Sequence, residues 1–427
     1  MDNRLYWIWL SLSCTVGSTN FIRLIEHFGS PSAIFEATDA EIAAVIGSSS
    51  SDYRALTDKN LDRANEILNF CISKNVGIVT YEDEKFPSSL KNIKNPPVLL
   101  YYRGVLPDFE NQFFISVVGT RRLSTYGKTN TYNVSYDVAK AGATIVSGMA
   151  HGIDGVALAA ALAAGQSTVA ILGSGIDVCY PREHRRLAQE IVKKGCVMTE
   201  YAPGTPPERH NFPKRNRLIS AISVATIVME GTEKSGSLIT ARCAFEQGKI
   251  VYALPGNVGN DKSEATNLLI MNGAKLFITA DDIVRDFDRS HPGKLNPFSL
   301  KREQRADMAQ TLASLMVSCV CTDDPVFRPA KRKATAQKSQ PRPVNEPIND
   351  SKTESTNAPA SDESAALALT PETLSLYKKI PTRGDCSIES LVDEKHNLRE
   401  VMNGLLTLEI SGFVTTIPGE RVRRKLN

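Results

Sequence analysis

The first 75 residues carry hydrophobic positions at the spacing of helix faces. Phe21, Leu24 and Phe28 fall on one face of a helix, and the glycine and proline that follow end this helix and begin another. A second helical pattern continues to Gly47. We therefore predict a small helical domain over residues 1–75.

Short helices joined by glycine-containing turns are typical of SAM-like and helix-hairpin-helix domains. Domains of this kind bind DNA backbones or partner proteins. A purely structural cap on the rest of the chain is an equally open interpretation of these helices.

From about residue 76 the pattern changes to apolar runs of strand length that alternate with helical stretches. Several of these runs are uninterrupted, as expected for parallel strands that helices cover on both faces. The repeated β-α-β spacing predicts an α/β fold with an extended, Rossmann-like, doubly wound and mostly parallel sheet over residues 76–288. The predicted strands are Phe113–Val118, Ala143–Ser147, Val169–Gly173, Cys196–Thr199, Ala225–Glu230, Ile250–Leu254 and Leu276–Ile278.

The chain after the sheet turns polar. One amphipathic helix is expected over Leu300–Met316. Residues 328–366 contain five prolines and no aromatic residue, so they cannot bury enough apolar area to offset chain entropy. We predict a linker over residues 289–368, largely disordered after residue 328. Its basic stretch, Lys331–Lys333, is expected to be solvated more often than bound to nucleic acid.

Regular structure is expected again over residues 369–427. Three helices followed by a β-hairpin predict a winged-helix domain. The expected elements are helices over Pro371–Lys379, Ser387–Val392 and Leu398–Ile410, and a hairpin of Phe413–Ile417 with Arg421–Lys425.

The charges of this domain do not favour sequence-specific binding of double-stranded DNA. Its longest helix carries Arg399 beside Glu400 and Glu409, and only the hairpin is basic. An acidic helix is poorly suited to an anionic major groove. We predict a protein contact or an auxiliary DNA contact for this domain.

Composition narrows the class of protein. A chain of 427 residues suggests two or three domains, and its net charge of only +3 means that a nucleic-acid site would have to concentrate charge locally. The apolar run Leu5–Leu12 is too short to span a bilayer and lacks the flanks of a signal peptide. The eight cysteines form no C-x-x-C pair, and the six histidines show no metal-ligand spacing. A cytoplasmic protein without membrane, metal or cofactor is expected.

Ligands of doubly wound sheets bind beyond the carboxyl ends of the strands, where helix starts expose unpaired amides. The first such end here contains Gly119, which permits close approach of a ligand, and then Arg121 and Arg122. The planar guanidinium suits bidentate phosphate contact.

The second strand end, Ser147-Gly148, belongs to a glycine-rich turn whose amides could receive an anion. Ser147, His151 and Asp154 also invite a hydrolase interpretation. Residues of one turn and its helix seldom converge as a triad, and no G-x-S-x-G elbow surrounds the serine. Hydrolase chemistry is therefore disfavoured.

The third strand end begins like a dinucleotide-binding fingerprint with Gly173 and Gly175. Val178 occupies the place of the third glycine, so the sequence does not support a nicotinamide cofactor. Arg182 follows shortly afterwards and is placed at the rim of the site.

The fourth strand end carries the densest charge. Lys214, Arg215 and Arg217 precede a buried strand, and the next helix begins at Lys234-Ser235-Gly236. Free backbone amides at a helix start, next to clustered cations, are suited to binding a phosphate. No G-x-x-x-x-G-K-[ST] motif accompanies them, so a nucleoside triphosphatase is not indicated.

These segments, taken in order, resemble the signature blocks of the DprA/Smf family. The similarity covers nearly the whole chain except residues 290–368. The blocks that carry it are Gly119-Thr120-Arg121, Ser147-Gly148-x-Ala150-x-Gly152-Ile153-Asp154, Leu172-Gly173-x-Gly175-x-Asp177, Tyr180-Pro181, Phe212-Pro213-x-Arg215-Asn216-Arg217, Lys234–Thr240 and Leu254-Pro255-Gly256.

The resemblance implies a non-enzymatic protein that binds single-stranded DNA, forms a homodimer through the Rossmann-like core and loads the RecA recombinase during natural transformation. It implies a basic pocket in which arginines and a lysine contact the strand while glycines and serines allow backbone approach. The candidate DNA-binding residues are Gly119, Arg121, Arg122, Ser147, Gly148, Arg182, Lys214, Arg215, Arg217, Lys234, Ser235 and Gly236.

Two other classes of function stay open. Nucleoside-monophosphate phosphoribohydrolases place a similar helix start over a phosphate, but their following glutamate is replaced here by Ala241-Arg242, with Glu230 and Glu246 as the nearest carboxylates. A transcriptional regulator would use the winged helix for duplex DNA and the core for a small ligand.

Overall fold

The computed structural model describes residues 3–288, 290–297, 306–316, 326–329, 371–382, 385–393, 398–410, 413–417 and 421–424. The chain divides into two compact units, residues 1–332 and 333–427. No described helix is long and apolar enough to cross a membrane.

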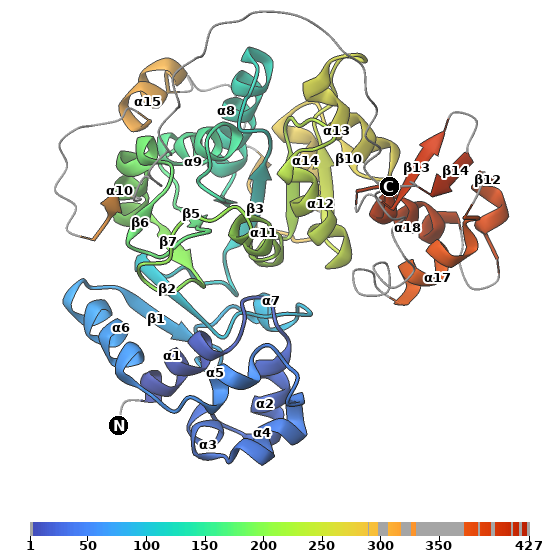
Figure 1. Cartoon of the computed structure of the whole chain (residues 1–427). Coiled ribbons are helices and arrows are strands. Elements are labelled where there is room, and N and C mark those ends of the chain that lie inside the picture. The colour runs from blue at the N-terminus through green and yellow to red at the C-terminus, as the bar shows by residue number, and fades with distance from the viewer. Residues whose placement is uncertain are drawn as a thin grey trace, which may run out of the picture. The chain divides into compact units, whose positions relative to one another are not determined.

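The first unit begins with six helices (Figure 1), and their apolar faces form one core with the adjoining sheet face. The second helical pattern of the sequence folds as two helices, because Thr38 and Glu41 form a capping box that starts a new one. The likeness to SAM or helix-hairpin-helix domains stays a prediction. The helices are α1 (Asn3–Ser13), α2 (Asn20–Phe28), α3 (Pro31–Glu36), α4 (Asp39–Ile46), α5 (Tyr53–Thr57) and α6 (Asp62–Ser73).

A nine-stranded sheet follows, in the order β1-β2-β7-β5-β4-β3-β8-β9-β10. All neighbours from β7 to β10 are parallel, whereas β2 is antiparallel to both β1 and β7. This confirms the predicted mostly parallel α/β sheet. The strands are β1 (Gly77–Thr80), β2 (Leu99–Gly104), β3 (Phe113–Val118), β4 (Ala143–Ser147), β5 (Thr168–Ile171), β7 (Cys196–Thr199), β8 (Ala225–Val228), β9 (Ile250–Ala253) and β10 (Lys275–Leu276).

Helices cover both faces of this sheet (Figure 1), so its central strands are buried throughout. One face is covered by α8 (Thr125–Lys140), α9 (Ile153–Ala163), α10 (Arg185–Lys194) and α14 (Ala280–Asp288). The other face is covered by α7 (Ser88–Lys91), α11 (Asn211–Ile222), α12 (Gly236–Glu246) and α13 (Asp261–Met271).

The strand order reverses beside β3. The chain proceeds from β3 outward through β4, β5 and β7, and then returns to place β8 on the other side of β3. A crevice forms at such a reversal because the helices after the two neighbouring strands leave in opposite directions. The carboxyl ends of β3 and β8 are therefore the place where the fold offers a binding site.

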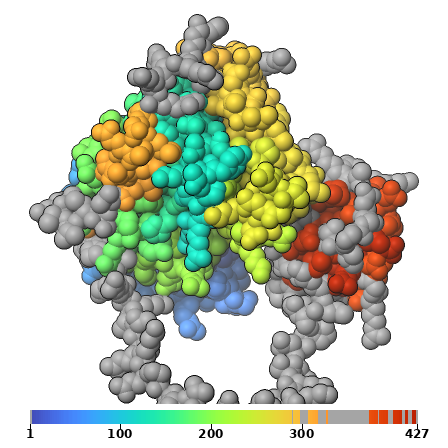
Figure 2. Space-filling model, turned by 90° about the horizontal axis from the view of Figure 1, so that it is seen from above, coloured from blue at the N-terminus to red at the C-terminus, as the bar shows by residue number. Residues whose placement is uncertain are grey.

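A segment beyond the sheet folds back onto this unit. The helix α15 (Met308–Leu315) packs on α9, with Leu312 buried, and Figure 2 shows it in orange against the teal surface of α8. The short strand β11 (Arg328–Pro329) pairs with β6 (Val178–Cys179). Part of the predicted amphipathic helix is thus present, and its residues 300–305 lie outside the described residues, as does most of the predicted disordered linker.

The second unit has its own small core. The helices α17 (Pro371–Lys379) and α18 (Leu398–Ile410) and the hairpin β13 (Val414–Ile417) and β14 (Arg421–Arg424) agree with the sequence prediction. The prediction of an α-helix over residues 387–392 is wrong. The chain there forms the strand β12 (Cys386–Ser387), paired with β14, and the short 3-10 helix η3 (Glu389–Leu391). The winged-helix assignment itself stays a prediction.

Candidate nucleic-acid interface

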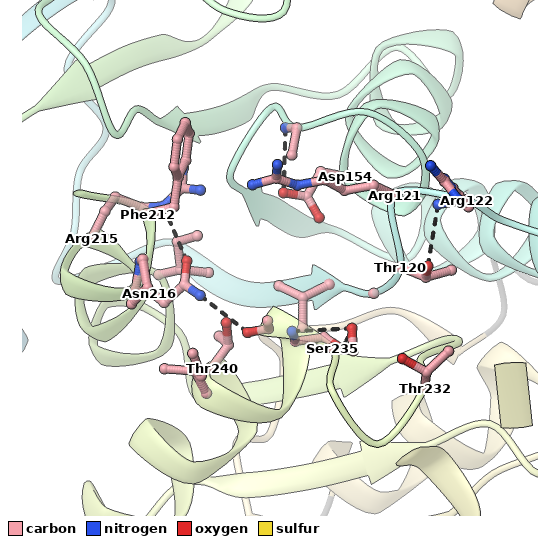
Figure 3. A pocket seen from close by; sticks show the side chains of 18 of the residues that line it. Thr120, Arg121, Arg122, Asp154, Phe212, Arg215, Asn216, Thr232, Ser235 and Thr240 are labelled. Carbon is pink, nitrogen blue, oxygen red and sulfur yellow. Dashed lines mark hydrogen bonds between the residues drawn. The ribbon is translucent and has the colours of Figure 1, made fainter. Parts of the chain in front are cut away.

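A cavity of about 690 Å³ opens at the point where the strand order reverses. Its walls come from the segments that follow β3 and β8 and from the first turns of α11, α12 and α13. Figure 3 shows the arginines after β3 and the α11 residues Phe212 and Arg215 across from Ser235 and Thr240, which belong to the start of α12.

The β3 end places two arginines at this cavity. Gly119 lies so close to the start of α9 that an added Cβ would come within 2.5 Å of Ile153, so only glycine fits. The next residue, Thr120, donates its N–H to the carbonyl of Glu230 at 2.8 Å. The chain then turns outward, which leaves Arg121 and Arg122 exposed on the cavity wall.

An aromatic ring lies close to two guanidinium groups on the same wall. The carbon at the centre of the Arg121 guanidinium is 5.1 Å from the centroid of the Phe212 ring, and that of Arg215 is 5.9 Å from it. Tyr180 adds a second ring, with its centroid 5.6 Å from that of Phe212. The half-buried Phe212 ring therefore offers a platform in a cationic setting.

Arg215 forms the buried floor of the cavity, and only 3% of its surface is exposed. It donates hydrogen bonds to the carbonyl oxygens of Gly148, at 2.9 Å, and Ile171. Burial lowers the pKa of Arg215 to about 10, with the nearby Asp154 opposing the shift. The guanidinium stays charged at neutral pH because this pKa still lies well above 7.

Asp154 lies beside this arginine and is itself buried. Its carboxylate accepts the N–H groups of Gly148, at 3.2 Å, and Ala150, at 3.4 Å. Burial raises the pKa of Asp154, while Arg215 and Arg121 act in the opposite direction. Asp154 therefore holds the turn after β4 in place.

The opposite wall is the start of α12. Ser235 caps this helix through its Oγ, which accepts the N–H of Ser237 at 3.4 Å. Gly236 is exposed, and an added Cβ would meet nothing within 4 Å, so the protein itself does not require glycine here. Because the first residue of α12 has no side chain, an anion in the cavity can approach the backbone of this helix start closely.

Two cations of the cavity were missed from the sequence. Arg209 precedes α11, and Lys262 lies in the first turn of α13 next to Asp261, which also lines the cavity. Neither is part of a dense basic cluster. The available signal for Lys262 was its place after the end of β9, because a fifth strand end of a parallel sheet joins the same edge.

The described residues that line the cavity carry a positive balance of charge. Five are cationic and two are acidic, so the formal balance is 5 − 2 = +3, equal to the balance of the whole chain. The cationic residues are Arg121, Arg122, Arg209, Arg215 and Lys262, and the acidic residues are Asp154 and Asp261.

Half of the twelve residues predicted to bind DNA line the cavity. These are Gly119, Arg121, Arg122, Arg215, Ser235 and Gly236. Their role in DNA contact stays a prediction.

The other six predicted residues do not line the cavity. Ser147 is buried and donates its hydroxyl to the carbonyl of Val117 at 2.6 Å, and Gly148 lies under Arg215. Arg182 and Lys234 are exposed nearby, and Lys214 is half-buried.

Arg217, the sixth, departs most from the prediction. Its side chain is 7% exposed and its Nη2 lies 2.5 Å from Oε2 of Glu200, whose side chain is 4% exposed. The sequence placed this arginine among the phosphate contacts, whereas the structure places it in a buried ion pair.

The carboxylates on which the phosphoribohydrolase alternative depends lie elsewhere. Glu230 accepts hydrogen bonds from the N–H and hydroxyl of Ser124 at the start of α8. Glu246 is exposed and forms an ion pair with Arg242 at 2.7 Å. Neither belongs to the described lining of the cavity, so that alternative loses both of its candidate acids.

Comparison with known proteins gives this arrangement a family. The sequence profile of the DNA recombination-mediator protein A family matches residues 77–288, which span the sheet and the cavity. The chain is 34% identical over 287 residues to protein Smf of Synechocystis, a match that covers 65% of this chain and 71% of that protein. The chain belongs to this family.

Other members of this family are also similar to the chain. The DNA processing protein DprA of Bacillus subtilis is 36% identical over 223 residues, covering 52% of this chain and 75% of that protein. The crystal structure of DprA from Streptococcus pneumoniae superimposes with a TM-score of 0.58 at 31% identity, covering 67% of this chain and 98% of that one. The Rossmann-like core is therefore shared with a solved family member.

Proposed function

We propose that the cavity binds single-stranded DNA. The observation that carries this proposal is the meeting of five cations, an aromatic ring close to two guanidinium groups and a helix start without a side chain at its first residue in one open cavity. Phosphate contacts from arginine, lysine and backbone amides give affinity without reading sequence. The aromatic ring adds a surface on which any base can stack.

The preference for a single strand follows from where the ring lies. The bases of a duplex are stacked on each other and their faces are hidden, whereas an unpaired base can present its face to Phe212. The ring is half-buried at the cavity wall, so a base must leave the line of its neighbours to reach it. A duplex would be limited to phosphate contacts at the cavity rim.

We further propose, on the family resemblance, that the protein loads RecA onto the bound strand in natural transformation and recombination. A homodimer in the cytoplasm, without enzymatic activity, completes this proposal. The family's description as a recombination mediator supports it. Sedimentation of the full chain tests the dimer, and RecA filament assembly on strands coated by a single-strand-binding protein tests the loading.

Fluorescence anisotropy with labelled single-stranded and duplex oligonucleotides over a salt series tests DNA binding itself. We expect tighter binding of the single strand, and a loss of about 10- to 100-fold for Arg121→Glu, since a hydrogen bond to a charged group contributes roughly 1.5–3 kcal/mol. Lys193→Glu is the matched control, because Lys193 lies on α10, is 65% exposed and undergoes the same change of charge.

Equal loss in both variants would show that only overall charge matters. Equal affinity for single strands and duplexes, or no effect of Arg121→Glu, would contradict the placement of the strand in this cavity.

A further inference from the structure

Arg217 belongs to the same helix as the cavity floor but points to a different environment. Arg215 and Asn216 line the cavity, whereas Arg217 is buried against Glu200. Residues two apart on a helix lie on different faces, which explains the separation. The helix α11 thus contacts the cavity with one face and the protein interior with another.

The buried pair joins α11 to the end of a strand. Glu200 directly follows β7, and its Oε2 accepts from Nη2 of Arg217 at 2.5 Å. Burial raises the pKa of Glu200, and the charge and hydrogen bond of Arg217 oppose this shift. The other Glu200 oxygen, and Nε and Nη1 of Arg217, have no hydrogen-bond partner among the described residues. Each charge therefore depends on the other for its stabilisation in the interior.

The backbone of Arg217 is held as well. Gln247, at the end of α12, donates its Nε2 to the carbonyl of Arg217 at 3.0 Å. Asn216 donates to the carbonyl of Gly236 at the start of α12, at 3.3 Å. Contacts at this point of α11 thus reach both ends of α12, whose start forms one wall of the cavity.

We infer that Arg217 and Glu200 are positioning residues for the DNA site, and that Arg217 is not a phosphate contact. The ion pair fixes how far α11 lies from β7, and so fixes Arg215 and Asn216 relative to the start of α12. This inference rests on the proposed function, because it assigns how the proposed site keeps its shape.

The decisive variant is Glu200→Gln, because a positioning role and an effect of overall charge alone predict opposite changes in single-strand affinity. Removing a negative charge strengthens attraction for an anion if charge alone matters. A positioning role requires weaker binding, because the buried charge of Arg217 then faces only a neutral amide and α11 is held less firmly. We expect single-strand affinity to fall about tenfold. The control is Glu246→Gln, which removes the same charge from an exposed ion pair and leaves affinity equal or slightly higher.

The salt dependence of binding separates a positioning residue from a contact. Loss of a phosphate contact lowers the slope of log affinity against log salt concentration by about 1. We expect this decrease for Arg121→Gln but an unchanged slope for Arg217→Gln, although both variants bind more weakly. The Arg217→Gln, Glu200→Gln double variant should recover affinity to within about threefold of the original chain, because two amides can pair without a buried charge.

Thermal unfolding of each variant shows that binding is measured on folded protein. Tighter or unchanged binding by Glu200→Gln, a slope lowered by Arg217→Gln as in Arg121→Gln, or no recovery in the double variant would each overturn the inference. Failure of the proposed function itself would appear differently, since the unmodified chain would then bind no single strand.

Discussion

Two regions of this protein are rich in arginine, and they use it in opposite ways. In the cavity, Arg121 and Arg122 are exposed toward the open volume. In the C-terminal hairpin, Arg421 pairs with Asp385, and Arg424 donates to the carbonyls of Ile380, at 2.8 Å, and Tyr377, at 2.9 Å.

Arg421 and Arg424 thus stabilise the C-terminal unit that contains them. Arg424 satisfies carbonyls at the end of α17 and lies over the Tyr377 ring at 4.1 Å, which stabilises a helix end and a small core. Arg423 is the described arginine of this hairpin that stays exposed without such a role. A basic run in a sequence therefore does not indicate a nucleic-acid site until the directions of its side chains are known.

After Arg121→Glu, the largest expected effect concerns the position of Arg215 at the floor of the cavity. In Gly148→Ala, the added Cβ would lie 2.4 Å from Nη2 of the buried Arg215, so the guanidinium must shift. We expect about a tenfold loss of single-strand affinity, which is near the effect of losing one hydrogen bond to a charged group, roughly 1.5–3 kcal/mol. Anisotropy measures this, and no loss would mean that the position of Arg215 is unimportant.

The matched glycine is Gly236, where an added Cβ meets nothing. Gly236→Ala should leave the free energy of unfolding unchanged or slightly higher, since alanine favours helix. Weaker single-strand binding in this variant would sharpen the account, because only a bound ligand could be obstructed there.

An effect of intermediate size is expected on stability, from His184, which contacts the turn that carries Gly148. His184 is buried, its Nδ1 lies 2.9 Å from the carbonyl of Met149, and burial lowers the pKa of His184 to about 4. A histidine of ordinary pKa, near 6.5 in the unfolded chain, binds a proton between pH 6.5 and 4 where the folded form does not. Stability is thus full above pH 6.5 and decreases as the pH falls toward 4.

Denaturant unfolding at pH 7 and pH 5 measures this. The original chain should lose about 2 kcal/mol more than His184→Gln over that interval, by proton linkage. The same loss in both proteins would show that His184 is not kept neutral by the fold.

The smallest effect is expected in the hairpin. Arg423→Glu should change single-strand affinity less than about twofold, because Arg423 does not belong to the described lining of the cavity and an exposed charge without a direct contact acts only through screened attraction. A loss comparable to that of Arg121→Glu would erase the contrast between the two regions and assign DNA contact to the C-terminal unit.

Much of the sheet could be predicted because its strands have a simple physical signature. A run such as Phe113–Val118 is buried on both faces, so it is apolar without interruption. The strand β1, at one edge of the sheet, and its neighbour β2 were missed, since they alternate less clearly and contain polar residues. Their pairing is antiparallel and depends on contacts distant in sequence.

The site was predictable where a motif directly follows a strand, as at Gly119 and Arg121. Arg217 was misplaced because the segment was read as a basic cluster before a strand, whereas it lies inside α11, where residues two apart diverge. Arg209 and Lys262 belong to no dense basic cluster, and only the place of Lys262 after the end of β9 could have indicated that it joins the cavity.

The most direct measurement is photocrosslinking of the full chain to single-stranded DNA that contains 5-iododeoxyuridine, followed by mapping of the modified residue. We predict crosslinks at Phe212, whose ring lines the cavity, or at Tyr180, whose ring centroid lies 5.6 Å from that of Phe212. They should be lost in Arg121→Glu and kept in Arg423→Glu. Crosslinks confined to residues 371–424 would contradict the central claim that the strand lies in the cavity.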